Sequence, residues 1–182
     1  MTLISSKKQA SLGVWCVVVL VLVLLGSGHV AVQRAISAEA ERRIAGTWEL
    51  AEWHFDDQVL KPPVVNGRVV FHDGQVVSVF SRDKDGTTYD FSGYGSYSLN
   101  QTAWSYGYER RVELTRRAGE NIVAQSTRDQ IPHAYRFEGA NLILDYHNGE
   151  RRFVFAPDEF TYIEKGQVLR KWRRLKGAQR VE

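Results

Sequence analysis

The sequence of 182 residues has room for one ordinary domain and a short appendage, and its 5 Trp, 8 Tyr and 8 Phe favour strands over helices. Part of the net charge of +3 comes from Lys7 and Lys8, which precede an apolar segment, so the remainder is close to neutral and nucleic acid is not an expected partner. The single cysteine, Cys16, excludes an intramolecular disulfide, and no Cys or His spacing predicts a metal or a cofactor.

The N-terminal part contains a long uncharged run. No Asp, Glu, Lys or Arg occurs between Lys8 and Arg34. A helix of this length can cross a bilayer core of about 30 Å at about 1.5 Å per residue. We therefore predict a transmembrane anchor over residues 1–32, with residues 12–32 in contact with the membrane.

The same run also has the form of a signal peptide, with a basic start, an apolar centre and small residues after it, so cleavage after Gly28 or Ala31 is the alternative. Both interpretations export the following domain. The expected location is the bacterial inner membrane, crossed once, with the domain on the periplasmic side. Residues 33–45 are polar and rich in helix formers, and we predict that they form a helical stalk.

From Gly46 onward the hydrophobic pattern changes to a period of two, which is typical of strands with one buried face. Turn sequences such as Asp73-Gly74 separate the segments. The predicted strands are 47–55, 68–72, 75–82, 93–99, 104–115, 121–127, 134–138, 141–146, 151–156, 160–163 and 167–175. No helical pattern connects them, so the sheet is expected to be antiparallel.

A row of short antiparallel strands has two unpaired edges, and closing the row into a ring removes both. The predicted fold is therefore mainly β. It is a closed up-and-down antiparallel barrel over residues 46–176, preceded by one transmembrane helix and followed by a tail at 177–182. A β-sandwich is the second choice, but a sandwich usually needs longer connections than this sequence contains.

Two clusters at the ends of this region predict how the barrel closes. Gly46 and Trp48 stand on the first strand, and Trp172 and Arg174 stand on the last. An indole can fill the narrow end of a small barrel, with a guanidinium on its face as a cation–π partner. We assign these four residues a structural role.

Several segments, taken in order, resemble the bacterial lipocalin-like domains, within the calycin group of ligand-binding barrels. They are GTWEL at 46–50, a proline- and glycine-marked strand with its turn at 62–74, an aromatic-Gly-x-Tyr strand at 89–97, and WRRL at 172–175. The resemblance covers residues 44–175 and implies a closed barrel that binds a ligand. Many members carry a His on the strand after the Gly-x-Tyr strand, where this chain has Trp104-Ser105-Tyr106, so any chemistry of that His is not expected here.

The strand predicted over 104–115 has one apolar face, and Arg110 is the exception on that face. A buried arginine needs an anionic partner. Glu52 or Asp90 could pair with Arg110 inside the protein, and the functional alternative is that Arg110 anchors a carboxylate or phosphate of a ligand.

The predicted function is a membrane-tethered, lipocalin-like protein that binds a small hydrophobic or amphipathic ligand. The candidate lumen residues are Trp104, Tyr106, Tyr108, Arg110, Tyr135, Phe137, Phe153 and Phe155. One alternative is a non-catalytic accessory subunit of a membrane complex, with a barrel filled by its own side chains. The other is an isomerase- or cyclase-type enzyme on a lipophilic substrate, although no motif selects a catalytic residue. An empty lumen of roughly 300 Å³ or more would favour a ligand.

Overall fold

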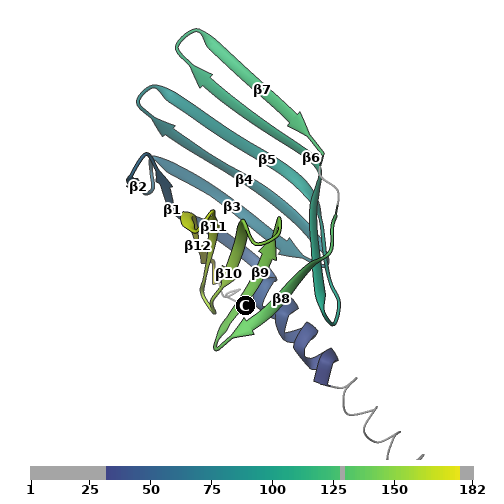
Figure 1. Cartoon of the computed structure of the whole chain (residues 1–182). Coiled ribbons are helices and arrows are strands. Elements are labelled where there is room, and N and C mark those ends of the chain that lie inside the picture. The colour runs from purple at the N-terminus through teal and green to yellow at the C-terminus, as the bar shows by residue number, and fades with distance from the viewer. Residues whose placement is uncertain (1–31, 128–129, 177–182) are drawn as a thin grey trace, which may run out of the picture. The chain divides into compact units, whose positions relative to one another are not determined.

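The computed structural model describes residues 32–127 and 130–176 (Figure 1). The chain divides after Glu39 into two units, and the described strands all belong to the second, Ala40–Glu182. The predicted anchor or signal segment lies outside the described residues except for Val32, and the tail at 177–182 lies outside them entirely. Within the described residues, no helix has both the length and the apolar character needed to cross a membrane.

A helix covers residues 32–44, in the stretch where we expect a polar stalk. Its last turn belongs to the second unit, where Ala40 and Ile44, four residues apart on one face, are buried in the core. The hydroxyl of Tyr97 donates a hydrogen bond of 2.5 Å to the Glu41 carboxylate. The end of the helix is therefore packed into the strand domain, and it is not a solvated spacer.

The strands follow one another through short turns, as the Gly- and Asp-containing sequences between them predict. They are β1 (Gly46–Phe55), β2 (Gln58–Leu60), β3 (Val65–His72), β4 (Gln75–Lys84), β5 (Thr87–Leu99), β6 (Ala103–Arg117), β7 (Glu120–Ser126), β8 (His133–Glu138), β9 (Asn141–Tyr146), β10 (Arg151–Phe155), β11 (Glu159–Glu164) and β12 (Gln167–Arg174).

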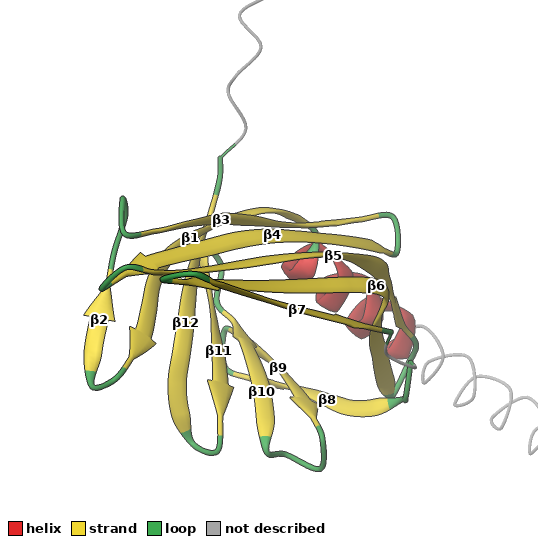
Figure 2. Cartoon of the chain, turned by 90° about the horizontal axis from the view of Figure 1, so that it is seen from above, coloured by secondary structure: helices red, strands yellow, loops and turns green. Residues whose placement is uncertain are grey.

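Ten of these strands form a ring in the order β1-β3-β4-β5-β6-β8-β9-β10-β11-β12, and β12 pairs back onto β1 (Figure 2). All the pairings are antiparallel. Strands β2 and β7 lie outside the ring, paired with β1 and β6 respectively. The closed antiparallel barrel predicted from the sequence is confirmed.

The strands of the ring differ greatly in length. β5 and β6 have 13 and 15 residues, whereas β10 has 5. The long strands β4, β5 and β6, with the shorter β7 paired to the end of β6, therefore extend well past the short strands β8–β12 and form a wall on one side of the barrel (Figure 1).

The junction between β6 and β8 is the shortest in the ring. β6 pairs with β7 from Arg111 to Arg117, but it pairs with β8 only at Ala103 and Trp104. Among the described strands, the other junctions of the ring each have at least four residue pairs.

A bulge in β6 changes which of its side chains face inward. Gly95 pairs with Tyr108, but its neighbour Tyr94 pairs with Arg110, so Glu109 is an extra residue in β6. The strict alternation predicted for 104–115 is therefore wrong after Tyr108. Arg110 is exposed rather than on the inner face.

The closed end of the barrel is packed around Trp48, which is fully buried. Its ring makes edge contacts with Phe155 at 5.5 Å and Phe160 at 5.1 Å, and its Nε1 donates to the Ile44 carbonyl at 3.0 Å. The Arg174 guanidinium lies 4.0 Å from the centre of the Trp48 ring. The indole thus has a partner for its polar atom and one for its π face.

Arg174 binds three backbone carbonyls, which belong to two segments of the chain at this end. Its Nη1 donates to the carbonyl of Ala45 at 2.5 Å, its Nη2 to that of Arg43 at 2.7 Å and its Nε to that of Pro157 at 3.0 Å. Burial lowers the pKa of the Arg174 guanidinium, and the charge of Asp158 opposes this effect. An arginine, with donors in a fixed fork, suits such a junction better than a lysine.

Replacing Gly46 by Ala is expected to lower the free energy of unfolding by about 1–3 kcal/mol. Gly46 has a φ of +135°, and an added Cβ would lie 2.7 Å from Nη1 of Arg174. Gly86→Ala is the matched control, because Gly86 also has a positive φ but its Cβ would meet no atom within 4 Å. Urea denaturation measures both variants, and equal losses would show that the contact with Arg174 imposes no constraint.

Candidate functional site

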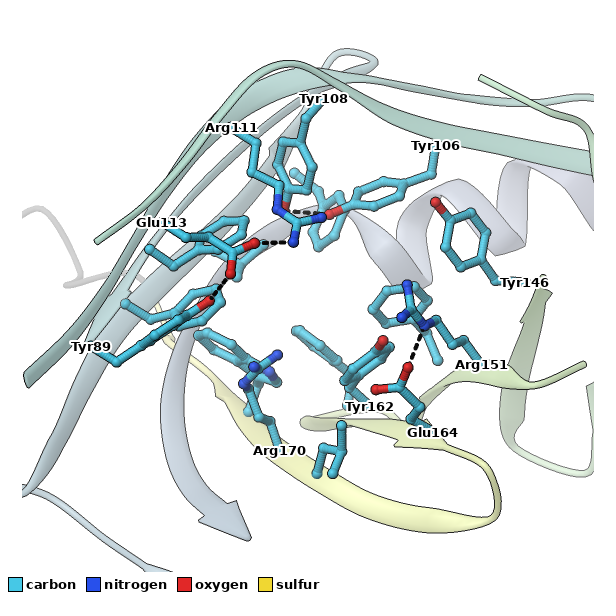
Figure 3. A pocket seen from close by; sticks show the side chains of 18 residues that line it. Tyr89, Tyr106, Tyr108, Arg111, Glu113, Tyr146, Arg151, Tyr162, Glu164 and Arg170 are labelled. Atoms are coloured by element: carbon cyan, nitrogen blue, oxygen red, sulfur yellow. Dashed lines mark hydrogen bonds and ion pairs between the residues drawn. The ribbon is translucent and has the colours of Figure 1, made fainter. Parts of the chain in front are cut away.

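A cavity of about 240 Å³ lies inside the barrel (Figure 3). Of the 18 side chains that line it, eleven are aromatic, two are aliphatic and five are charged. Phe160 packs edge-on against Trp48, and Trp172 stacks on Phe160 at 5.5 Å, so these two rings separate the cavity from the closed end.

Three of the predicted lumen residues line this cavity: Tyr106, Tyr108 and Phe153. Trp104 and Phe155 are also buried, but they lie in the packed region next to the cavity, where only a void of about 10 Å³ remains. The lumen is therefore divided into a filled part and an open part.

The other three predicted lumen residues do not line the cavity. Tyr135 and Phe137 are partly buried against the core, and the Tyr135 hydroxyl donates to the Asn100 carbonyl at 2.9 Å. Arg110 is exposed because of the bulge. Its suggested partners bind elsewhere: Asp90 pairs with Arg116, and Glu52 binds a neighbouring cluster of His54, Lys61 and Lys171.

On the long-strand wall, a chain of hydrogen bonds joins three side chains of the cavity. Arg111 donates through Nη2 to one oxygen of Glu113, and the Tyr89 hydroxyl donates to the other at 2.7 Å. Arg111 also lies over the ring of Phe91, at 5.6 Å, while its Nε is buried without a partner. One N–H donor of this arginine thus lacks an acceptor among the described residues.

On the short-strand wall, Arg151 of β10 and Glu164 of β11 form the second ion pair of the cavity, with 2.6 Å between Nε and the carboxylate oxygen. The side chains of Arg151 and Glu164 are 32% and 27% exposed, and those of Arg111 and Glu113 are 30% and 23% exposed. Water therefore reaches the charged end of the cavity.

Arg170 differs from the other two arginines of the cavity because it has no carboxylate partner. None of the described residues forms a hydrogen bond or ion pair with it, and its Nε is buried. Its guanidinium lies instead between rings, 4.3 Å from the centre of Trp53, 4.7 Å from Phe80 and 5.7 Å from Tyr162. Burial lowers the pKa of Arg170 from its ordinary value, but a guanidinium stays charged at neutral pH.

A second arginine, Arg82 of β4, shares the Trp53 ring with Arg170. Its guanidinium lies 3.5 Å from the centre of Phe55 and 5.0 Å from that of Trp53, and its Nε is buried without a partner. Burial lowers its pKa, and the charge of Asp56 opposes this effect. Positive charge is therefore concentrated around Trp53, beside the cavity.

Two of the tyrosine hydroxyls of the cavity belong to a chain of hydrogen bonds that ends at Ser78. Tyr106 donates to Tyr108, which donates to Ser78 at 2.8 Å. Burial raises the pKa of Tyr108 and also that of Tyr89. Tyr89 and Tyr108 stay protonated at neutral pH, so these two phenols are hydrogen-bond donors and not bases at that pH.

Reasoning from the sequence missed Arg111 and Arg170. Arg170 stands two residues before Trp172 on a predicted strand, and this spacing is the signal that both face the interior. For Arg111 the signal is weaker. Gly95 and Gly107 lie against each other at the bulge, where a Cβ on Gly95 would be 2.0 Å from the Gly107 carbonyl oxygen, and glycines within strands often mark bulges.

Among the described residues, no group of three or more His, Cys, Asp or Glu side chains is placed to hold a metal ion. Comparisons with protein-family models, with curated proteins and with solved structures give no significant match. The closed antiparallel barrel is compatible with a lipocalin-like fold, and the chemistry of the site has to be argued from its own residues.

Alkaline titration is expected to reveal tyrosines that ionise late. Burial raises the pKa of Tyr89 and Tyr108 in the folded protein. Their contribution to stability is therefore complete below about pH 10, and it is lost as the pH rises through the pKa values of the folded state. Part of the phenolate absorbance should therefore appear only as far-UV dichroism is lost. Tyr89→Phe should remove one late phenol. Ionisation of all eight tyrosines near pH 10 in folded protein would contradict the assignment.

Proposed function

We propose that the barrel is a binding protein for a small amphipathic molecule, which places its apolar part among the aromatic rings of the cavity and its polar part at the charged end. The observation that carries this proposal is the cavity itself. It is an unfilled volume with aromatic walls, and its two ion pairs, Arg111–Glu113 and Arg151–Glu164, stand where water reaches it.

The size of the cavity limits the ligand. Its volume of 240 Å³ is below the roughly 300–1,000 Å³ of pockets for drug-sized ligands, and so also below the roughly 300 Å³ expected of an empty lumen that holds a ligand. It is nevertheless far larger than the void of 10 Å³ in the packed region. A molecule with a short apolar chain or a single ring matches this volume, whereas a whole phospholipid does not.

The proposal includes the location inferred from the sequence. A lipocalin-like barrel tethered by residues 12–32, or exported by a signal peptide, would meet its ligand on the periplasmic side of the inner membrane. The uncharged run between Lys8 and Arg34 supports this part of the proposal.

An enzymatic role has less support. The two carboxylates that line the cavity, Glu113 and Glu164, are each bound to an arginine. Its hydroxyl groups include Tyr89 and Tyr108, whose pKa values burial raises. General acid–base catalysis usually needs a group whose pKa lies near the working pH.

One observation favours the accessory-subunit role as a second candidate. β7 lies at the end of the long-strand wall and is exposed along its whole length, with Ile122 and Val123 more than half exposed. Among the described strands only β6 pairs with it, and its other edge is able to pair with a strand of another chain. In this case the partner would bind the wall and leave the cavity unoccupied.

The first test is native mass spectrometry of the full-length chain, extracted in mild detergent from its own membranes. We expect the barrel to retain a small-molecule adduct. The intact mass reports at the same time whether residues 1–28 are present. Co-purifying subunits in fixed ratio without any small adduct would favour the accessory role and contradict the binding proposal.

Filling the cavity is expected to remove the adduct. Leu169→Trp adds an indole to a side chain that lines the cavity, at a cost of about 1–3 kcal/mol in stability. Val79→Trp is the matched control, since Val79 is 56% exposed on β4. Circular dichroism checks that both variants are folded. An adduct that survives Leu169→Trp in full would place the ligand elsewhere.

A further inference from the structure

We infer that the ligand is a small organic monoanion, an apolar chain or ring with one carboxylate, and that Arg170 binds this carboxylate. The inference rests on the proposed function, because it names the class of molecule that the cavity would hold.

The first argument is the missing partner of Arg170. A buried charge is costly unless another charge or several hydrogen bonds compensate it. Arg111 and Arg151 each have a glutamate, but none of the described residues supplies one to Arg170, and its Nε is buried without an acceptor. The folded protein therefore keeps, at the wall of an unfilled cavity, a cation that forms no ion pair with a described residue and feels the charge of Glu164 only through space.

The second argument is the orientation of the donors. Arg170 comes from β12 and Arg111 from β6, and they reach the cavity from opposite sides (Figure 3). The Nε of Arg111 is also buried without an acceptor, while its Nη2 is occupied by Glu113. An anion in the cavity would thus lie between two guanidinium groups, and no described residue forms a hydrogen bond with that of Arg170.

The third argument is the charge balance. The five charged side chains that line the cavity are three arginines and two glutamates, so one positive charge is left over. One negative charge on the ligand neutralises the site, whereas a dianion would leave it negative. A planar carboxylate also matches the fork of a guanidinium, with two parallel hydrogen bonds.

A purely structural role for Arg170 predicts a different behaviour. If its contacts with Trp53 and Phe80 were its purpose, replacing Arg170 by Met would destabilise the ligand-free protein. If the charge is kept for a ligand, the same replacement removes an unpaired cation, and the ligand-free protein should be as stable as the wild type or more stable.

The experiment compares octanoate with octan-1-ol, which has the same chain but no charge, by isothermal titration calorimetry. The protein is the full-length chain in lipid nanodiscs, so that no detergent competes for the cavity, and empty nanodiscs supply the blank. The variants are Arg170→Met, Arg170→Lys and, as the matched control, Arg110→Met, which removes an exposed arginine of β6.

We expect the wild type to bind octanoate at least about tenfold more tightly than octan-1-ol. Arg170→Met should abolish this preference and leave the affinity for octan-1-ol unchanged, Arg170→Lys should keep part of it, and Arg110→Met should change neither affinity. Octyl phosphate, added as a dianion near pH 8, should bind more weakly than octanoate.

The outcomes separate the two proposals. If neither octanoate nor octan-1-ol binds, the binding function fails and the inference with it. The inference is overturned, while the binding function stands, if the wild type binds octanoate and octan-1-ol equally or if Arg170→Met weakens the binding of both ligands alike. The same holds if Arg170→Met lowers the melting temperature of the ligand-free protein, or if octyl phosphate binds more tightly than octanoate. Should Arg170→Met fail to fold, it too counts against the inference.

Discussion

The contact of Arg174 with Trp48 is the interaction on which the rest of the barrel depends. It joins the first strand of the ring to the last, at the register where Trp48 and Arg174 are paired. The same guanidinium holds the backbone just before β1 and the turn before β11. The ring closes where β1 pairs with β12, and the contact between Trp48 and Arg174 lies at this pairing. It also fills one end of the barrel with aromatic rings, so that the space left open is confined to the other end.

The open space follows from the unequal lengths of the strands. The long strands continue past the ends of the short strands. In that region the side chains of the long strands have no facing strand to pack against. The side chains that reach this region are long ones, Arg111 and Glu113 from the wall and Arg151 and Glu164 from the short strands, and they form pairs along their own walls. Arg170 is the exception, since aromatic rings occupy the places where a carboxylate would be. The interior thus changes from a packed core to a partly charged cavity within one barrel.

The sequence predicts the barrel better than it predicts the cavity. Period-two alternation and turns such as Asp73-Gly74 act over a few residues, so the order of strands and their closure follow from local signals. The inward face of β6 follows from alternation only up to Tyr108, because one inserted residue, Glu109, exchanges the two faces beyond it. That exchange brings Arg111 inside and Arg110 outside. Which arginines have a carboxylate within reach depends on the register of strands far apart in the sequence, and periodicity carries no information about it.

The two-pair junction between β6 and β8 has a consequence for motion. The free energy needed to open part of a structure grows with the hydrogen bonds and buried contacts that must be broken. A ring whose other described junctions each have four or more residue pairs will separate first where only two, at Ala103 and Trp104, hold neighbouring strands together. Amide hydrogens on either side of this junction should exchange with solvent sooner than those of the β4–β5 pair. The barrel would open locally between β6 and β8 while its closed end stays intact.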